Sequence, residues 1–118
     1  MQFAEERARQ AYQAAKEGMT IEKYAAYVKK FPAYVMTNGL AATIAFAQSK
    51  KKEKNPDPAY KKICEQLHAR LRVYGICEEE NYNDFMDWLL KQDSGVYRRA
   101  TAEVIAYLEW LRRFAGEE

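Results

Sequence analysis

The chain is poor in residues that interrupt helices and in residues that most often carry out catalysis. Its 118 residues include five glycines, three prolines, two cysteines and one histidine, whereas 48% are hydrophobic and 14% are aromatic. This balance excludes a disordered or low-complexity chain and favours a helix-rich protein with a hydrophobic core. The length predicts one domain, over residues 1–118, because a chain of this size can bury a single core.

The shortage of catalytic residue types argues against an enzyme. His68 is the sole histidine, and the serines, Ser49 and Ser94, lie before a lysine-rich loop and at an expected helix cap. A nucleophilic triad needs a nucleophile, a histidine base and a carboxylate, and these positions do not suggest one. Since the sequence also has no glycine-rich phosphate loop, we predict neither catalytic residues nor a cofactor.

The cysteines leave a metal site and a core thiol as alternatives. Cys64 and His68 are four residues apart in a predicted helix and Cys77 follows, which gives three of the four ligands of a structural zinc site. The paired spacings typical of zinc sites are missing, however, and Cys64 falls on the apolar stripe of its helix. We therefore prefer the core-thiol interpretation and predict no metal. Free thiols in a sequence without a secretory signal are typical of cytoplasmic proteins.

Residues 31–49 contain no charged side chain, although 31% of the whole chain is charged. Pro32, Thr37 and the pair Asn38-Gly39 interrupt this stretch, so we expect no membrane span. Asn38-Gly39 is a good helix terminator. The residues from 40 to 48 are small or apolar on nearly every side of a helix, which predicts a position at the centre of a bundle.

Apolar periodicity predicts an all-α protein, a single compact bundle of about six helices. The expected helices cover residues 2–17, 20–31, 40–48, 58–74, 82–89 and 96–115, with a further short helix over 32–38. Pro32 should disfavour a helical conformation at Phe31, while Thr20 and Asn81 should cap the helices that follow them. Residues 49–58, with four lysines and two prolines, form a predicted surface linker.

Charge is distributed unevenly along the chain. Residues 1–54 carry 10 basic and 5 acidic side chains, and residues 55–118 carry 9 and 12. Lysines flank the uncharged stretch on both sides and could hold a phosphate backbone without reading bases, or could serve only solubility. In the last helix we expect surface pairs between Arg99 and Glu103 and between Glu109 and Arg113. The candidate nucleic-acid-binding residues are Lys29, Lys30, Lys50, Lys51, Lys52, Lys54, Arg98, Arg99 and Arg112.

Three segments resemble a known family. The stretches KKFPAYVMTNGLAATIAF (29–46) and DSGVYRRATAEVIAYLEWLRRFA (93–115) are similar to two signature regions of the Cmr-type small subunit of type III-B CRISPR RNA-guided effector complexes, and ERARQAYQAAKE (6–17) resembles its first helix. The resemblance implies an all-α bundle without catalytic residues that lines the inner filament beside guide RNA and target RNA. Its partners would be the other subunits of the complex and further copies of itself. A helical protein–protein adaptor with no direct nucleic-acid contact is the alternative hypothesis.

Overall fold

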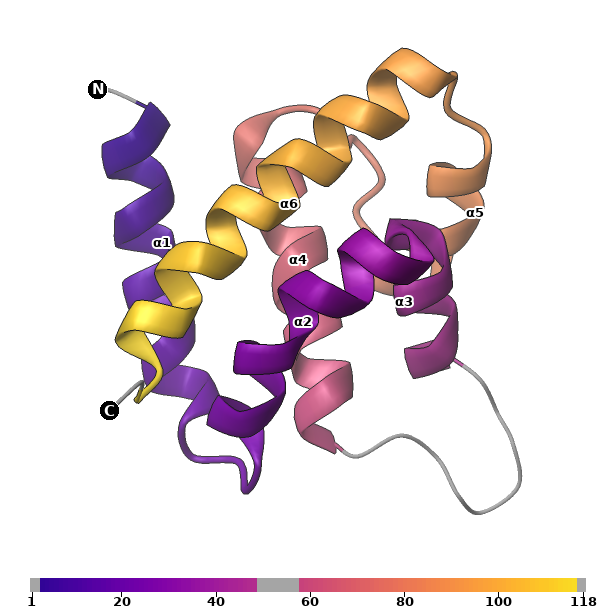
Figure 1. Ribbon diagram of the computed structural model, residues 1–118. Coiled ribbons are helices and arrows are strands. Elements are labelled where there is room, and N and C mark those ends of the chain that lie inside the picture. The colour runs from indigo at the N-terminus through magenta and orange to yellow at the C-terminus, as the bar shows by residue number, and fades with distance from the viewer. Residues whose placement is uncertain (1–2, 49–57, 117–118) are drawn as a thin grey trace.

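The computed structural model describes residues 3–48 and 58–116 (Figure 1). Its helices are α1 (Phe3–Gly18), α2 (Tyr24–Asn38), α3 (Leu40–Gln48), α4 (Pro58–Tyr74), α5 (Phe85–Leu90) and α6 (Ser94–Phe114), with a 3₁₀ turn, η1 (Tyr82–Asp84), before α5. No strand occurs in the described segments, and the predicted all-α fold is confirmed.

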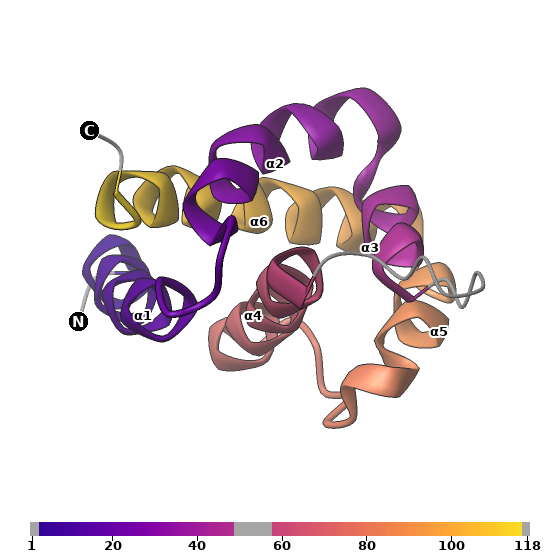
Figure 2. The ribbon, with the colours of Figure 1, turned by 90° about the horizontal axis from the view of Figure 1, so that it is seen from below.

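The longest helix, α6, crosses the molecule and packs against α1, α2 and α4. In Figure 2, α1 and α2 lie on opposite sides of α6, while α3 and α5 pack together near its N-terminal end. Side chains of all six helices contribute to one hydrophobic core. Its fully buried members include Phe31, Leu40, Ile44, Ile63, Leu67, Leu71, Val104, Leu108 and Leu111.

A buried ion cluster joins α1, α4 and α6. Arg70 is 0% exposed, and its Nε donates a 2.7 Å hydrogen bond to Oε2 of Glu103, which is itself 4% exposed. Arg7 donates two hydrogen bonds of 2.8 Å to the same carboxylate. Arg70 also donates to Gln10 at 2.8 Å and to Glu6 at 3.3 Å. These charge-assisted bonds are directional, so they fix how the three helices sit against one another.

The start of α2 is set by burial of Tyr24 and not by a cap at Thr20, which was wrongly predicted. The ring of Tyr24 lies so close to Gly18 that a Cβ atom placed there would be 2.0 Å from its Cζ. The Tyr24 hydroxyl donates to the side chain of Gln66 in the core. The Thr20 hydroxyl instead donates to the carbonyl of Glu17 at 2.9 Å, which helps to close the turn after α1.

Pro32 lies inside α2 and does not begin a separate helix, so that prediction is wrong. Proline removes one helical hydrogen bond and crowds the preceding turn. Phe31 and Val35 lie on either side of it and are 0% and 2% exposed. Their burial in the core offsets the local cost, as tertiary packing commonly overrides helix propensity.

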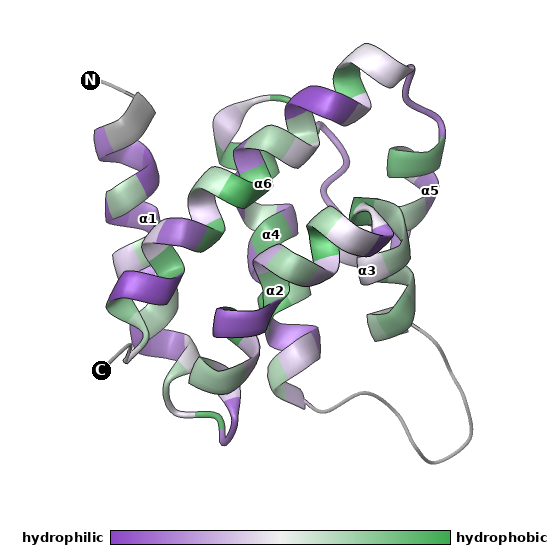
Figure 3. Cartoon of the chain, in the orientation of Figure 1, coloured by the Kyte–Doolittle hydropathy of each residue, from purple (hydrophilic) through white to green (hydrophobic). Residues whose placement is uncertain are grey.

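The helix of the uncharged stretch, α3, is buried on one side only. Leu40 and Ile44 are 0% exposed, but Phe46 is 57% exposed, and Ala42 and Ala45 also face outward. The prediction of a central helix is therefore wrong, because α2, α4 and α5 cover one face and the other face remains apolar (Figure 3). Within the described residues, no helix has both the length and the apolar character that a membrane span requires.

The predicted helix caps can be compared with the structure at two places, before η1 and at the start of α6. The side chain of Asn81 accepts a 2.9 Å hydrogen bond from the N–H of Asn83, which confirms the predicted cap, although the element that follows is a 3₁₀ turn before α5. At α6 the cap is Asp93, whose carboxylate accepts from the N–H of Val96 at 2.9 Å, and not the expected Ser94.

Candidate nucleic-acid interface

The helices α2 and α6 pack side by side in opposite directions. The start of α6 meets the end of α2, where Tyr97 Oη accepts a 2.8 Å hydrogen bond from the N–H of Ala41, just beyond α2. The end of α6 lies beside the first half of α2, where both helices line one pocket. This arrangement brings Lys29 and Arg112, two of the predicted RNA-binding residues, to the same place.

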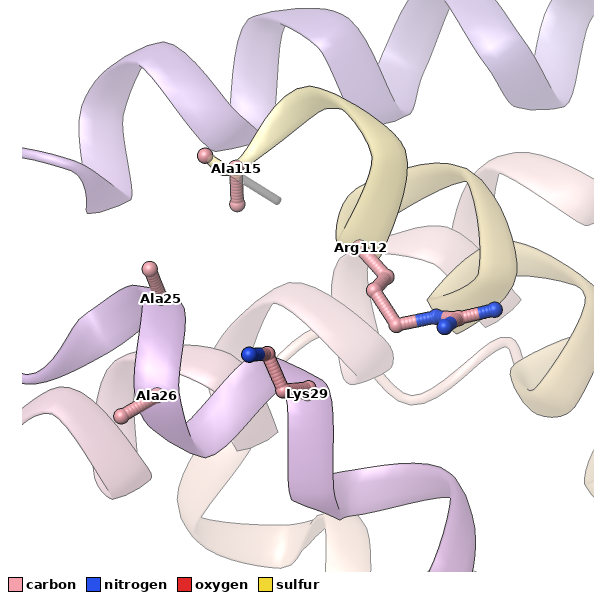
Figure 4. Close-up of a pocket in the computed structure, with 6 residues that line it drawn as sticks. Ala25, Ala26, Lys29, Arg112 and Ala115 are labelled. Carbon is pink, nitrogen blue, oxygen red and sulfur yellow. The ribbon is translucent and has the colours of Figure 1, made fainter. Parts of the chain in front are cut away.

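The pocket has a volume of 230 Å³ and small, largely apolar walls. Ala25, Ala26 and Lys29 line it from α2, and Arg112, Ala115 and Gly116 line it from the end of α6. In Figure 4, the Lys29 side chain ends within the gap between the helices, whereas the guanidinium of Arg112 points away from it.

The charge at this pocket is positive. Lys29 is exposed, and the Arg112 side chain is 39% exposed. Arg112 donates a 2.7 Å hydrogen bond to Glu109 on its own helix, and no acidic side chain occurs among the described residues that line the pocket. Ammonium and guanidinium groups both donate hydrogen bonds to phosphate oxygens. To share an anion with Lys29, the Arg112 guanidinium would have to leave Glu109 and turn toward the pocket.

The other predicted binding residues are only partly gathered there. Lys30 is exposed beside Lys29 on α2. Arg98 and Arg99 are exposed at the start of α6, about 21 Å along the helix from Arg112. The predicted binding residues that the structure describes thus form two groups, one at each end of α6.

The remaining predicted residues, Lys50, Lys51, Lys52 and Lys54, lie outside the described residues. A meeting of these lysines with Lys29 and Lys30 therefore stays a prediction.

A family model described as CRISPR-associated protein (Cas_Cmr5) matches residues 3–117, nearly the whole chain. The chain belongs to the Cmr5 family. It is also similar to a CRISPR-associated Cmr5 family protein from Thermus thermophilus, known from an X-ray crystal structure. The two chains are 28% identical with a TM-score of 0.72, and the match covers 98% of this chain and 96% of the other. Cmr5 is the small subunit of the type III-B Cmr complex, so the resemblance seen in the sequence is confirmed.

In this Cmr5 family chain the two long segments that carried the resemblance touch each other. Gly39, with φ of 93°, ends α2 and turns the chain into α3. The first turn of a helix has N–H groups without intrahelical partners, and the Tyr97 hydroxyl accepts the one from Ala41. A Cβ at Gly39 would lie 3.6 Å from that hydroxyl. Sequence analysis did not identify Tyr97, because nothing local to α6 indicates a bond to α3.

Both predicted surface pairs of α6 are wrong. Glu103 faces the core and bonds Arg70 and Arg7, not Arg99. Glu109 bonds Arg112 at i,i+3, while the guanidinium of Arg113 lies over the ring of Trp110, 5.3 Å from its centroid. The spacing rule that predicted these pairs considers neighbours on one helix only.

The three residues considered for a zinc site, Cys64, His68 and Cys77, are instead buried in the bundle. Cys64 is 0% exposed in the core, as predicted, and burial raises the pKa of its thiol far above the ordinary value. His68 Nε2 lies 2.7 Å from the carbonyl oxygen of Glu79, and burial lowers the pKa of His68. Cys77 also contacts the Glu79 carbonyl, with Sγ at 3.8 Å. Over residues 3–48 and 58–116, no three His, Cys, Asp or Glu side chains are grouped to hold a metal ion.

Proposed function

We propose that this chain is a non-catalytic, cytoplasmic subunit that packs along the inner filament of a type III-B effector complex. It associates there with other subunits and further copies of itself, and its basic residues hold the backbones of guide and target RNA. The observation that carries the RNA contact is the pocket that Lys29 of α2 and Arg112 of α6 line together. Family membership supports the association with the other subunits.

Recognition without base reading fits both the site and the complex. Apart from Lys29 and Arg112, the side chains that line the pocket are alanines, which have no group that could hydrogen bond to a base edge. Cations that contact phosphates bind nucleic acid with little sequence preference. In a guide-directed complex, base pairing supplies the sequence specificity, so a protein subunit that binds only the backbone does not interfere with it.

A structural role is supported by the state of the residues that could do chemistry. The Glu103 carboxylate is held by two arginines, and the Cys64 thiol is kept protonated by burial. His68 contacts a backbone carbonyl on the inner side of α4. These groups are buried and help to stabilise the bundle.

A helical adaptor without RNA contact is the second candidate. The observation in its favour is the outward apolar face of α3, with Ala42, Ala45 and the 57% exposed Phe46. Apolar side chains in that arrangement are suited to a protein partner. RNA contact and protein contact make different predictions about salt.

The test is the affinity for single-stranded RNA across a series of salt concentrations. We expect the double variant Lys29→Gln/Arg112→Gln to bind more weakly and to reduce the slope of log K against log salt by about 0.7 for each phosphate that the protein no longer neutralises. The control is Lys61→Gln/Lys91→Gln, which removes two exposed lysines that pair with Glu65 and Asp87 on other surfaces. Equal slopes in both variants would favour the adaptor.

Assembly is tested separately by co-purification. The tagged chain should recover the other effector subunits together with a guide RNA. Recovery of the chain alone, or with unrelated proteins, would refute the proposed function whatever the salt series shows.

A further inference from the structure

A strip of aromatic rings and cations runs along α1 and the C-terminal half of α6, and we name it the aromatic strip. Tyr12 and Phe114 meet edge to face with ring centroids 5.3 Å apart, and Phe114 stacks on Trp110 at 5.7 Å. A cation lies over each outer ring: Lys16 Nζ is 4.7 Å from the centroid of Tyr12, and the Arg113 guanidinium is 5.3 Å from that of Trp110.

The aromatic strip is open to solvent. Tyr12 is 48% exposed, Lys16 and Arg113 are exposed, and Trp110 and Phe114 are partly exposed. Tyr12 and Lys16 share a face of α1 because four residues make about one helical turn. A tyrosine ring exposed to this extent presents a π-face to solvent as well as a hydroxyl.

This surface is distinct from the pocket with Lys29. Arg112 and Ala115 line that pocket together with residues of α2, whereas Phe114 contacts Tyr12 on α1. The helices α1 and α2 lie on opposite sides of α6 (Figure 2). The end of α6 therefore presents one basic surface on each flank.

We propose that the aromatic strip binds unpaired RNA bases by stacking on Tyr12 and Trp110, while Lys16 and Arg113 hold the adjoining phosphates. The ligand class is single-stranded RNA, and the choice of RNA rests on the proposed function. Aromatic rings beside cations are the usual means of binding single strands without sequence preference, since every base has a π-face. The cations that now cover the rings are attached to flexible side chains, so a base can replace them and release them to the phosphates.

The charge of the strip favours a nucleic acid over an acidic or apolar protein segment. A purely apolar partner would leave Lys16 and Arg113 without counterions, and a simple acidic peptide would not use the exposed rings. Glu5, on the same face of α1, lies about three turns from Lys16. Two acids lie closer to the strip, and each pairs with a cation outside it: Glu17 with Lys62 and Glu109 with Arg112. Single-stranded RNA uses both the rings and the cations.

The experiment follows Trp110 fluorescence in a Trp88→Phe background, which leaves Trp110 as the sole tryptophan. Trp88 is 8% exposed, and its indole N–H has no hydrogen-bond partner among the described residues, so phenylalanine removes no hydrogen bond. The probes are a 15-nucleotide oligouridylate, an RNA duplex of the same length and inorganic polyphosphate. We expect the single strand to quench Trp110 and polyphosphate to bind without quenching, with the duplex giving little change.

Two substitutions of Tyr12 form a matched pair. Tyr12→Leu keeps an apolar contact with Phe114 but removes the ring, and it should weaken oligouridylate binding about fivefold, the lower end of the range for one stacked base. Tyr12→Phe keeps the ring and should bind like the parent. Unchanged Trp110 emission on saturation with oligouridylate, or equal affinity of the two Tyr12 variants, would overturn the inference.

Failure of the inference and failure of the proposed function give different results. If Lys29→Gln/Arg112→Gln lowers the salt slope while Tyr12→Leu changes nothing, the pocket binds RNA and the aromatic strip does not. If Tyr12→Leu reduces recovery of partner subunits but not RNA affinity, the strip is a protein interface and the inference is wrong. If the parent binds no single-stranded RNA, the inference falls, and co-purification alone decides whether the chain is an effector subunit.

Discussion

Replacement of Glu103 by glutamine should destabilise the fold more than any surface change of the same kind. The carboxylate is 4% exposed and accepts three hydrogen bonds, two from Arg7 and one from Arg70. In Glu103→Gln, the fully buried guanidinium of Arg70 loses its buried counterion, and an amide NH2, which cannot accept a hydrogen bond, replaces one of the carboxylate oxygens. Breaking a buried ion pair by removing one partner typically costs about 3–5 kcal/mol.

The neighbours of Arg70 determine where in this range the loss should fall. Glu6, whose side chain is 33% exposed, still lies 3.3 Å from Arg70, and Gln10 still accepts at 2.8 Å. Arg7 is 19% exposed and can regain water. We therefore expect the lower end, about 3 kcal/mol, out of a total stability of about 5–15 kcal/mol for a domain of this size.

Urea unfolding followed by circular dichroism measures this loss. The midpoint should fall while the slope of free energy against urea stays constant, because the change affects stability and not the surface exposed on unfolding. Glu109→Gln is the control, since its pair with Arg112 is partly exposed and contributes less than about 1 kcal/mol. A further variant, Arg70→Met/Glu103→Leu, should lose less free energy of unfolding than Glu103→Gln, because it removes both buried charges and leaves neither without a partner. A loss below about 1 kcal/mol in Glu103→Gln, no larger than for an exposed pair, would refute the reasoning.

Three further predictions concern packing, one hydrogen bond and pH. Gly18→Ala should destabilise the protein by about 1–3 kcal/mol, because the new Cβ would meet the ring of Tyr24, and thermal unfolding would show no change if the turn simply moved aside. Tyr97→Phe should cost about 1 kcal/mol in urea unfolding, since the N–H of Ala41 loses its acceptor, and an unchanged midpoint would show that water replaces the hydroxyl. Burial lowers the pKa of His68, so the unfolded chain binds its proton more readily, and stability should fall as pH drops below the unfolded value of about 6.5. Urea midpoints at pH 7.5 and 5.5 should differ less in His68→Gln than in the parent, and equal differences would assign the pH effect to other groups.

Much of the fold could be predicted from the sequence because most boundaries are marked by local residues. Pro58 and Gly75 bracket α4, and Asn38-Gly39 separates α2 from α3, as predicted. Pro32 misled the prediction since its effect on the backbone is local, whereas the burial of Phe31 depends on distant residues such as Tyr60 of α4. The burial of α3 was overestimated because alanine is compatible with either a buried or an exposed face, and the sequence does not say which helices cover it.

The sequence identified residues that line the candidate pocket, but it did not predict that they lie together. Lys29 and Arg112 were both identified by charge, and only the antiparallel packing of α2 and α6 shows that they line one pocket. Glu103 was paired with Arg99 in the prediction because the i,i+4 rule considers one helix and takes no account of the arginines on α1 and α4. The sequence analysis did not single out Tyr12 or Trp110, since the contact that brings their helices together, Tyr12 with Phe114, joins residues far apart in the sequence.

The ion cluster around Glu103 also constrains how this protein can change in evolution. The Glu103 carboxylate accepts hydrogen bonds from arginines of two other helices. Replacing either Glu103 or Arg70 alone would leave the other charge buried without its partner, so neither residue should be lost alone. Relatives that lack an acid at position 103 should therefore also lack the arginine at position 70, with both exchanged for apolar residues. Substitutions at positions 70 and 103 should covary across the family even though neither residue lies at a proposed RNA contact.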